Sequence, residues 1–416
     1  MNNPAQDSYQ LYIGGEWVDA SDGATLDSFC PATGEKLSTI ADATREDVDR
    51  AVEVAWKAFE TWGKTDKTER AAILNKVADI IEENAEKLAL LETLDNGKPI
   101  RETRAIDIAY SVDHFRYFAG VLLADTGEAD ILPGNMMSLV LHEPIGVVGQ
   151  IVPWNFPFLM AAWKLAPVLA AGDCTVFKPS STTSLSVLEF AKLTQDVIPA
   201  GVFNVITGKG SKSGQYLLEN QRISKLAFTG STEVGRDVAR AAADRLIPAT
   251  LELGGKSANI IFPDAQWDMV IDGVQLGILF NQGQVCCAGS RIFVHEDIYD
   301  KFVEDAVAAF NKVKVGMPWE DDTQMGSQID ERQMNKILGY IDIAKQEGGK
   351  VLCGGERYTE GECAKGAFLK PTMIEVPNNS CRCAQEEIFG PVAVVIKFKD
   401  EQEVIDMAND SVYGLG

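Results

Sequence analysis

The sequence predicts an α/β fold built on parallel sheets, and two observations indicate it. Between residues 145 and 245, short apolar runs typical of buried strands alternate with stretches of helical periodicity. A second region that mixes strands and helices begins near Leu253. Strands that alternate with helices imply right-handed crossovers and a parallel sheet, and such sheets bind ligands at the carboxyl ends of their strands.

The N-terminal part carries short strands followed by helices. LYIGGEWV at 11–18 predicts two strands that turn at Gly14 and Gly15. Thr44 and Asp47 form a capping box at the start of a helix. Apolar spacing predicts two more helices, with faces formed by Leu74, Val77, Ile81, Leu88 and Leu91, and by Ala105, Ile108, Val112 and Phe115.

The strand–helix units follow a loop and one strand-like segment, MSLVLH, within residues 124–143. Apolar runs predict four strands, each followed by a helix: strands at 145–152, 174–179, 202–208 and 225–230, and helices at 159–170, 184–197, 214–219 and 231–245. In the second region the same patterns predict strands at 258–262, 291–295 and 393–398, and helices at 269–280, up to Lys312 and at 332–345.

Composition sets the class of protein and narrows its partners. A chain of 416 residues with 46% hydrophobic content is long enough for two or three domains with their own cores. Acidic residues outnumber basic ones by 61 to 38, which gives a net charge of −23. A strongly acidic protein repels phosphate backbones, which disfavours nucleic acid as a partner.

Segments that would direct the chain to a membrane are not evident. The most apolar stretch, 157–172, contains Lys164 and Pro167 and is too short to span a bilayer of about 30 Å. The first ten residues lack a basic region followed by an apolar one. We therefore expect no membrane partner and a cytoplasmic location.

The eight cysteines and three histidines form no pattern of metal ligands. The sequence contains no CxxC and no HExxH, so we expect reduced thiols and no metal site. It also lacks the GxSxG elbow and the GxxxxGK[ST] loop. Hydrolysis by a metal or by an elbow serine and P-loop chemistry are therefore disfavoured.

Two polar side chains follow predicted strands. Asn155, in VPWNFP, either caps the next helix or directs its amide at a developing oxyanion. Lys178, in FKPS, is either an exposed lysine at a strand end or a donor to a nucleotide ribose. The residues alone leave these alternatives open.

Two glycine-containing loops join strands to helices. They are TGKGSKSG at 207–214 and FTGSTEVG at 228–235. Glycine allows close approach of the backbone, and a helix N-terminus offers free N–H groups to a pyrophosphate. Neither loop matches GxGxxG, and such loops are also ordinary turns, but two in consecutive units favour a phosphate site.

A carboxylate and two thiols complete the set. Glu252 lies between leucines in LELGGKS on an expected strand, and a buried carboxylate has a raised pKa that suits a general base. Cys286 and Cys287 follow a glycine-containing loop in FNQGQVCCAGSR. A cysteine there is either an inert buried side chain or a nucleophilic thiolate.

In combination, these segments resemble the aldehyde dehydrogenase superfamily of the NAD(P)-dependent, non-phosphorylating type. The resemblance runs from IGGEW at 13–17 to the last residue, and LELGGKS followed by GQVCCAGSR is its most specific part. Its carriers, in family order, are EPIGVVGQIVPWNFP, KLAPVLAAG, FKPS, FTGSTEVG, LELGGKS, FNQGQVCCAGSR and QEEIFGPV.

The resemblance implies a fold and its division. It implies a Rossmann-like parallel-sheet cofactor domain over 1–123 and 144–253, and a second α/β catalytic domain over 254–416. Residues 124–143 match a small strand-based oligomerisation element. Family chains continue beyond YGLG, so the resemblance also implies a catalytic domain that is incomplete at this end.

The resemblance also implies a reaction, the oxidation of an aldehyde to the acid with NAD as hydride acceptor. Cys286 matches the nucleophile that adds to the carbonyl, and Asn155 with the backbone N–H of Cys286 matches the oxyanion donors. Glu252 matches the base that activates water against the resulting thioester. The positions that match cofactor contacts are Trp154, Lys178, Ser181, Gly230, Ser231, Gly235, Gln333, Lys336, Glu387 and Phe389.

Position 181 departs from the family pattern. Many members specific for NAD have a glutamate there, whose carboxylate would repel a 2′-phosphate, and this chain has Ser181. The sequence therefore leaves NADP open beside NAD. The residues that match the substrate pocket are apolar or aromatic and favour aliphatic or aromatic aldehydes: Phe156, Met160, Trp163, Val285 and Cys287.

The expected partners are a small aldehyde and further copies of the chain, as a homodimer or homotetramer. Two rival functions remain. A cofactor-free thiol acyl-hydrolase would use Cys286 and Glu252 but leaves Lys178 and Ser231 unexplained. A non-catalytic binding or structural protein on the same scaffold would not need the set of Cys286, Glu252 and Asn155.

Overall fold

The computed structural model describes residues 3–416, which form two compact units. The first unit comprises residues 3–28, 37–92 and 104–252. The second comprises 29–36, 93–103 and 253–416. Most of the second unit lies after Leu253, and it also takes two short segments from the N-terminal part of the chain.

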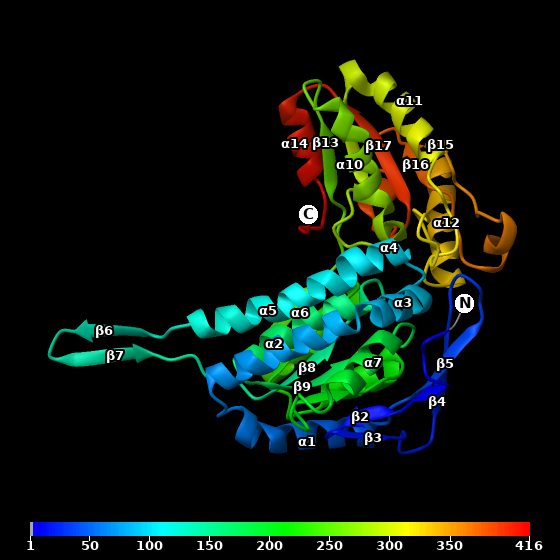
Figure 1. The fold of residues 1–416 in the computed structure, drawn as a ribbon. Helices are drawn as coiled ribbons and strands as arrows, with labels where there is room; N and C mark the ends of the chain where they lie inside the picture. The colour runs from blue at the N-terminus through cyan, green and yellow to red at the C-terminus, as the bar shows by residue number, and fades with distance from the viewer. Residues whose placement is uncertain (1–2) are drawn as a thin grey trace. The chain divides into compact units, whose positions relative to one another are not determined.

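The first unit is built on a seven-stranded sheet with the order β12-β11-β8-β9-β10-β2-β3 (Figure 1). Strands β8 to β12 run parallel to one another, and β2 and β3 join as an antiparallel hairpin. The strands are β2 Leu11–Ile13, β3 Glu16–Val18, β8 Val147–Ile151, β9 Cys174–Lys178, β10 Phe203–Val205, β11 Lys225–Thr229 and β12 Ala249–Glu252.

Figure 1 shows α1 on one side of this sheet and α6, with α2 and α5, on the other. The predicted capping box at Thr44 and Asp47 is confirmed at the start of α1. The helices of this part of the chain are α1 Arg45–Trp62, α2 Lys67–Glu83, α3 Ala85–Asn96, α5 Ala109–Ala124, α6 Pro157–Ala171, α7 Leu185–Thr194, α8 Gln215–Glu219 and α9 Thr232–Arg245.

Two predicted helices differ from the observed ones. The single helix expected across residues 74–91 is two helices, because Asn84 leaves the helical region and its side-chain amide donates to Ile80. The helix expected over 105–115 begins as α4 Ile100–Glu102 and a π-helical turn, Thr103–Ile108, before α5. The first of these faces is buried as predicted, as Leu74 and Ile81 show. In the second, Ile108, Val112 and Phe115 are buried, but Ala105 in the π-helical turn is exposed, which corrects the prediction at that position.

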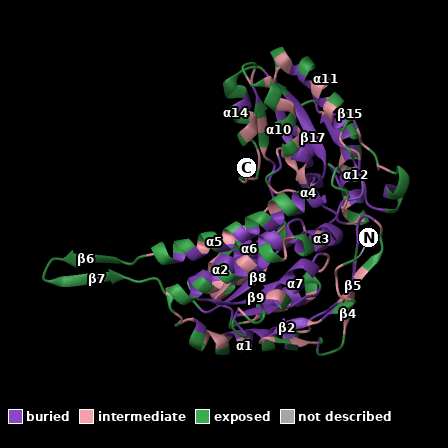
Figure 2. Ribbon diagram, viewed as in Figure 1, coloured by how far each residue is buried: buried purple, intermediate pink, exposed green. Residues whose placement is uncertain are grey.

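Two smaller sheets accompany the seven-stranded one. Strands β1 Ser8–Tyr9, β5 Lys36–Ala41 and β4 Thr25–Phe29 form a sheet in the order β1-β5-β4. Strands β6 Glu128–Leu132 and β7 Met136–Val140 form a two-stranded hairpin whose residues are almost all exposed (Figure 2). The sequence predicted β7 but not β6.

The second unit has a five-stranded sheet with the order β13-β14-β17-β16-β15, in which only β15 is antiparallel. Its strands are β13 Ala258–Ile261, β14 Arg291–His295, β15 Lys350–Cys353, β16 Thr372–Glu375 and β17 Val392–Phe398. Its helices are α10 Trp267–Leu279, α11 Tyr299–Phe310, α12 Glu331–Gln346, α13 Arg382–Gln385 and α14 Glu401–Asn409, with 3₁₀ turns at Phe280–Gly283, Glu296–Ile298 and Gly361–Lys365.

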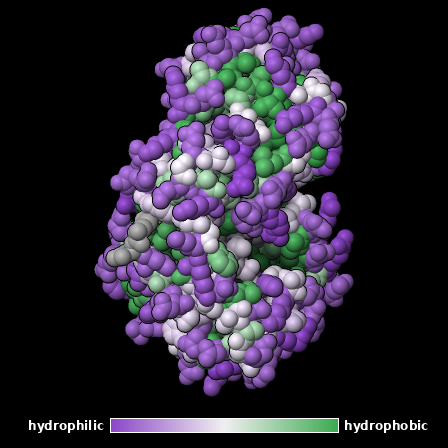
Figure 3. Space-filling model, turned by 90° about the vertical axis from the view of Figure 1, so that its right-hand side faces the viewer, coloured by the Kyte–Doolittle hydropathy of each residue, from purple (hydrophilic) through white to green (hydrophobic). Residues whose placement is uncertain are grey.

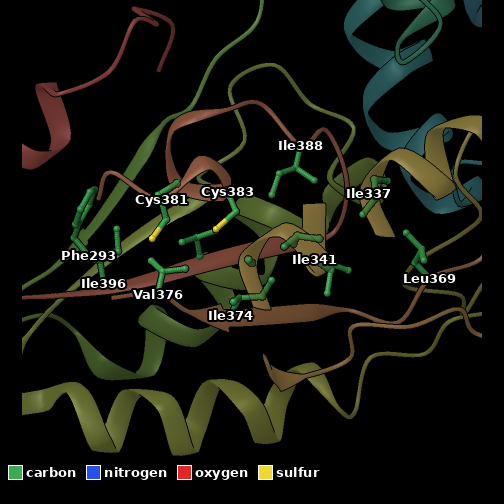
Figure 4. Packing of buried hydrophobic residues seen from close by; sticks show 14 of the residues in the cluster. Phe293, Ile337, Ile341, Leu369, Ile374, Val376, Cys381, Cys383, Ile388 and Ile396 are labelled. Carbon is green, nitrogen blue, oxygen red and sulfur yellow. The ribbon is translucent and has the colours of Figure 1, made fainter. Parts of the chain in front are cut away.

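An apolar core lies on the face of this sheet that α12 covers. Ile337 and Ile341 of α12 pack with Ile374 of β16 and Ile396 of β17 (Figure 4). Cys383 belongs to the same cluster and is fully buried. Burial of this apolar surface, at about 25 cal/mol per Å², is the main favourable contribution to the stability of the unit.

Hydrophilic side chains cover much of the face in Figure 3, as the acidic composition suggests. Within residues 3–416, no helix combines the length and apolar character needed to cross a membrane.

Candidate active site

The carboxyl edge of the parallel strands in the first unit gathers most of its predicted site residues. Asn155 follows β8, Lys178 ends β9, Gly230 and Ser231 follow β11, and Glu252 ends β12. Strand order reverses at β8, since β9 and β10 lie on one side of it and β11 and β12 on the other. Ligands of doubly wound sheets bind at such a switch point, so this edge is the natural place for a dinucleotide.

Asn155 lies in the turn between β8 and α6. Its side chain is buried, with 3% exposure. The N-cap position of α6 is Phe156, whose side chain forms no capping hydrogen bond. Asn155 therefore lies one residue before the N-cap position, and both interpretations of its side chain, as a helix cap or as an amide donor, stay predictions.

Lys178 is buried at the end of β9, which contradicts the alternative of an exposed lysine at a strand end. Its Nζ donates a hydrogen bond to the carbonyl of Pro179 at 2.9 Å. Burial lowers the pKa of this ammonium to about 8, partly opposed by the charge of Asp42. A buried ammonium at the carboxyl edge has few partners in the protein and suits a polar ligand such as a ribose.

The two glycine loops lead into different kinds of helix. The second loop opens α9, where the Ser231 hydroxyl accepts a hydrogen bond from Val234 at 3.4 Å and Gly235 is buried. Gly230 donates its N–H to the carbonyl of Glu252 at 3.0 Å, which fixes this loop to β12. The first loop leads into a π-helical turn, Gly210–Gly214, so only the second ends at an α-helix N-terminus of the kind that binds pyrophosphate.

Ser181 and Trp154 also lie at this edge and are half-buried. The hydroxyls of Ser180 and Thr182, on either side of Ser181, are 2.9 Å apart. This turn therefore presents hydroxyls and no carboxylate at position 181, where many NAD-specific family members have a glutamate.

The prediction that the carboxylate of Glu252 is buried is wrong, because its side chain is exposed. The reason is the strand order: β12 is the edge strand of the sheet, and its residues are exposed or half-exposed. Burial lowers the pKa of Lys164 in α6 to about 8, and the negative charge of Glu252 partly opposes this shift. Glu252 therefore has a cationic neighbour within the first unit.

In the second unit, the site segments gather at the opposite, amino edge of the sheet. LELGGKS precedes β13, FNQGQVCCAGSR precedes β14 and QEEIFGPV precedes β17. These strands are adjacent and parallel, so their amino ends lie together. The contacts of Gly255 confirm that the three loops lie close together. Its N–H donates to Glu387 at 3.1 Å, and a Cβ on it would collide with the carbonyl of Cys286.

The loop that carries the thiols is held in an unusual backbone conformation. Asn281, Gln282 and Gly283 have φ of +45°, +54° and +71°. A left-handed run of non-glycine residues costs free energy that its surroundings must offset. Gln282 is fully buried and donates to the carbonyl of Ser327 at 3.0 Å, and Gln284 accepts from the N–H of Ile329 at 3.0 Å.

Cys286 and Cys287 lie in the turn after this loop, half-buried and exposed respectively. The thiols of these adjacent residues interact, which lowers the pKa of Cys287 to about 6 and, together with burial, raises the pKa of Cys286. Cys287 is therefore the more acidic thiol of the two.

The predicted cofactor residues of the second unit cluster around Glu387. Burial raises the pKa of this carboxyl, and the charges of Lys336 and Lys256 lower it. Gln333 donates to the carbonyl of Phe389 at 2.8 Å, and Phe389 has a φ of +61°. Gln333 therefore positions the backbone beside Glu387, which is a structural contact that the sequence did not indicate.

Lys256 lies in the LELGGKS segment and is not among the predicted site residues. It is 2% exposed, and its Nζ has no hydrogen-bond partner among residues 3–416. Burial lowers its pKa to about 7, while Cys383 and Glu387 act in the opposite direction. A lysine directly after two glycines in a loop was the only available signal.

The expected pocket residues divide between the units. Phe156 and Met160 are buried, and Trp163 of α6 is 43% exposed and stacks on His114 at 5.5 Å between ring centroids. Val285 is half-buried beside the thiols. Within residues 3–416, no three His, Cys, Asp or Glu side chains are grouped to hold a metal ion.

The first unit has a doubly wound sheet, and the second has a loop that carries two thiols. These features define an α/β protein with a candidate thiol nucleophile. The sequence model of the aldehyde dehydrogenase family matches residues 17–416, so the chain belongs to this family. It is therefore an oxidoreductase that acts on aldehydes.

Individual relatives agree with this assignment. The chain is 48% identical to aldehyde dehydrogenase B of Escherichia coli K12, over 98% of this chain and 81% of that protein. The NAD+ complex of an aldehyde dehydrogenase from Bacillus cereus is 42% identical, with a TM-score of 0.95, over 98% of this chain and 83% of that one. Betaine aldehyde dehydrogenase from Staphylococcus aureus, in complex with NAD+, is 41% identical, with a TM-score of 0.96, over 98% and 81%.

Proposed function

We propose that Cys286 is the nucleophile with which this aldehyde dehydrogenase attacks its substrate. The observation that carries the proposal is the meeting of three loops at the amino ends of β13, β14 and β17. One of these loops carries the half-buried thiol of Cys286. A thiolate adds to the carbonyl carbon of an aldehyde and forms a tetrahedral thiohemiacetal. Loss of hydride from that carbon leaves a thioester on Cys286.

Asn155 and the backbone N–H of Cys286 act as donors to the oxyanion of the thiohemiacetal in this proposal. The support for Asn155 is its burial in the turn between β8 and α6, at the carboxyl edge of the sheet. A buried, preorganised amide stabilises charge that develops on the carbonyl oxygen. Removing one such donor typically costs a factor of about 10²–10³ in turnover.

Glu252 activates the water that hydrolyses the thioester. Its support is the position at the end of β12, where its backbone carbonyl is tied to Gly230 and its carboxylate has Lys164 as a neighbour. A carboxylate that water can reach can accept a proton from it. It thus acts after the hydride has left.

The enzyme uses NAD, the cofactor bound by its Bacillus cereus and Staphylococcus aureus relatives, to accept the hydride. The residues present fit this cofactor, since the α9 N-terminus suits its pyrophosphate and a buried ammonium at Lys178 suits a ribose. We assign contacts with it to two groups, Trp154, Lys178, Ser181, Gly230, Ser231 and Gly235 at one sheet edge, and Gln333, Lys336, Glu387 and Phe389 at the other.

Position 181 sets the choice between the two dinucleotides in this proposal. Ser181 offers no negative charge, so we expect activity with NADP as well as NAD. Ser181→Glu should restrict the enzyme to NAD, because the carboxylate repels the 2′-phosphate. The ratio of kcat/KM for the two cofactors measures this, and an unchanged ratio in Ser181→Glu would show that position 181 does not discriminate.

The substrate is an uncharged aliphatic or aromatic aldehyde. The side chains assigned to its pocket, Phe156, Met160, Trp163, Val285 and Cys287, contain no ionised group apart from the thiol. Apolar walls bind apolar substrates by removing their surface from water. A panel of aldehydes that differ in charge and size tests this, and a preference for a charged aldehyde would contradict it.

Copies of the chain associate through the β6–β7 hairpin. Ile131 pairs with Met137 and Ala129 with Leu139, so one face of the hairpin is an apolar strip, with Ile131 76% exposed. An isolated two-stranded hairpin is marginally stable in water, and a strip of this kind is stabilised by burial against a second copy. Light scattering of Ile131→Asp should show smaller particles than the wild type, and an unchanged mass would exclude the hairpin.

A cytoplasmic location is also part of the proposal. Its support is the set of eight free cysteines, six of them buried, which suits a reducing compartment. Cell fractionation tests it, and recovery in an extracellular fraction would overturn it.

The decisive test of the thiol is Cys286→Ala. We expect the variant to lose aldehyde oxidation, by a factor of at least about 10⁴ as for other removed nucleophiles, while binding of NAD remains. Cys363→Ala, which removes a buried cysteine elsewhere, is the matched control. Unchanged turnover in Cys286→Ala would end the assignment.

Product assays with and without NAD separate the rival functions. A cofactor-free acyl-hydrolase would hydrolyse a thioester or ester at the same rate with and without NAD and would produce no reduced nicotinamide from an aldehyde. A non-catalytic protein would bind without turnover. The appearance of one reduced nicotinamide for each acid formed supports the dehydrogenase.

A further inference from the structure

A fully buried carboxyl group lies at the N-terminus of α6. Glu92 of α3 is 0% exposed, and its Oε1 accepts a hydrogen bond from the backbone N–H of Phe158 at 3.0 Å. Its Oε2 accepts a hydrogen bond from the hydroxyl of Ser186 in α7 at 2.6 Å. Glu92 therefore joins α3, α6 and α7, and all three residues belong to the first unit.

The N–H that donates to Glu92 is the first one of α6. The helix begins at Pro157, which has no N–H, so Phe158 supplies the first backbone donor. The N-cap residue, Phe156, forms no capping hydrogen bond with its side chain. A carboxyl group is a favourable acceptor at this end, because the helix dipole makes it electropositive. Glu92 thus caps α6 from another helix, 66 residues earlier in the chain.

The side chain of Phe158 is held in place together with its N–H. It is 2% exposed, and its ring meets the ring of Phe190 in α7 edge to face, with 5.6 Å between the ring centroids. Ser186 and Phe190 are four residues apart in α7, so they lie on the same face of that helix. The start of α6 is therefore fixed to α7 twice, directly by the two rings and indirectly through Glu92.

This anchor lies three residues after Asn155. The segment between them is stiff, because Pro157 fixes its own φ and restricts the residue before it. The middle of α6 is held separately, since Gln150 of β8 donates to the carbonyl of Lys164 at 2.8 Å. Loss of Glu92 should therefore release the first turn of α6 and the turn that carries Asn155, while the rest of the helix stays in place.

We propose that Glu92 is a positioning residue for aldehyde oxidation, which sets the direction of the Asn155 amide by capping α6. The proposal rests on the proposed function in one respect, since it takes Asn155 as a donor to the oxyanion. Glu92 itself contacts neither substrate nor cofactor. It acts through the turn before α6, so its removal slows the step in which negative charge develops on the carbonyl oxygen.

The expected effect is large, because an oxyanion donor stabilises the transition state only when it is aimed at the developing charge. Removing such a donor costs a factor of about 10²–10³, and a misplacement of about 1 Å costs up to about 10². We therefore expect Glu92→Ala to lower the rate of the first hydride transfer about 10–100-fold. Rapid mixing at saturating NAD and aldehyde measures this rate.

Two further variants at position 92 separate the reach of the side chain from its charge. Glu92→Gln keeps the length and an acceptor oxygen for the N–H of Phe158, and its NH₂ can donate to the hydroxyl of Ser186, so it should keep most of the wild-type rate. Glu92→Asp keeps the acid but is one methylene shorter, so it should lose contact with Phe158 and be slow. A Glu92→Asp variant as fast as Glu92→Gln would overturn the proposal.

Glu189 of α7 provides the matched control. It is 2% exposed, accepts a hydrogen bond from the hydroxyl of Tyr9 at 3.1 Å and pairs with Lys87 of α3. Glu189 therefore also joins α3 to α7, but neither of these partners lies in α6. Glu189→Ala should lose stability as Glu92→Ala does and should keep the rate of hydride transfer per folded molecule. Equal losses of rate in both variants would mean a general loosening of the unit and would overturn the proposal.

A double-mutant cycle with Asn155→Ala identifies the route of the effect. If Glu92 acts through Asn155, adding Glu92→Ala to Asn155→Ala should lower the rate by less than about 3-fold, whereas independent effects multiply. Glu92→Asp takes the place of Glu92→Ala in the cycle if the alanine variant does not fold. Losses that multiply would show that Glu92 acts by another route and would overturn the proposal.

The single variants keep this proposal apart from the proposed function. A normal rate of hydride transfer in Asn155→Ala would refute the oxyanion role of Asn155, and the positioning role of Glu92 with it. A slow Asn155→Ala together with normal rates in Glu92→Ala and Glu92→Asp would refute only the positioning role and would leave the proposed function intact.

Discussion

The two units present their candidate groups at opposite ends of parallel strands. In the first unit, Asn155, Lys178, Ser231 and Glu252 lie at the carboxyl edge of the sheet. In the second, the segments that contain Gly255, Cys286 and Glu387 precede β13, β14 and β17 and lie at the amino edge. The rule that ligands bind at carboxyl ends therefore describes the first unit and not the second.

The difference extends to how each edge is held. At the carboxyl edge, side chains extend from strand ends and from the first turn of α9. At the amino edge, backbones touch: Gly283 lies against Gly390, and Gly255 lies against Cys286. Side-chain changes at the first edge should therefore alter chemistry with little loss of stability, whereas a Cβ added at the backbone contacts of the second edge should destabilise that unit.

The largest expected effect sharpens the chemical side of the comparison. Glu252→Gln should leave the first turnover of hydride transfer intact and lower steady turnover about 10²–10⁴-fold, because only water activation needs the carboxylate. Rapid mixing that follows reduced nicotinamide measures both phases. Glu60→Gln, at an exposed position of α1, is the control, and loss of the first turnover in Glu252→Gln would contradict a role limited to deacylation.

The backbone side of the comparison can be broken with a pair of glycines. Gly283→Ala places a Cβ against the carbonyl of Gly390 at a φ of +71°, so we expect a loss of unfolding free energy of about 3 kcal/mol or more. Gly210→Ala, in the glycine loop of the first unit, meets no atom within 4 Å and should be nearly neutral. Chemical denaturation measures both, and equal losses would remove the distinction.

A pH series tests the buried Lys256 at the amino edge. Its pKa of about 7 lies below the value in the unfolded chain, so the unfolded state binds more protons and the cost of burial is relieved as pH rises above 7. The wild type should gain stability relative to Lys256→Met between pH 7 and 10, by up to about 1.4 kcal/mol per pH unit. A difference that does not change with pH would mean that Lys256 stays charged.

The smallest expected effect compares one helix cap from each unit. Ser231 accepts from Val234 at 3.4 Å at the start of α9, and Asp330 accepts from Gln333 at 2.6 Å at the start of α12. Asp330→Ala should cost about 1–2 kcal/mol and Ser231→Ala about 0.5–1 kcal/mol, because the cap in α12 is shorter and charged. Thermal unfolding ranks the two, and the reverse order would contradict this reasoning.

The sequence predicted the strands that are marked by apolar runs and missed those that depend on neighbouring strands. Strands β8, β9 and β11 lie in such runs, so local sequence alone located them. Strands β15 and β16 have four residues each, and β15 is only partly buried. Such short segments become strands because β17 lies beside them, which no local pattern shows.

The candidate site shows the same limit. The strand–loop–helix order predicted that Asn155, Lys178 and Ser231 would meet at one edge. It did not predict that Glu252 is exposed, because the edge position of β12 follows from strand order. It also gave no sign that the loops before β13 and β14 touch, since this contact requires the two strands to be neighbours.

The N-terminal segments that join the second unit limit how the molecule can be divided. Pro31 accepts from the N–H of Ala367 at 3.1 Å, Gly97 accepts from Ser327 at 3.2 Å, and Glu102 accepts from Asn281 at 2.9 Å. A fragment that starts at Leu253 would lack all three acceptors, including the one that holds the start of the thiol loop. The second unit is therefore not a transplantable module, and recombination within this family should exchange whole chains more readily than halves.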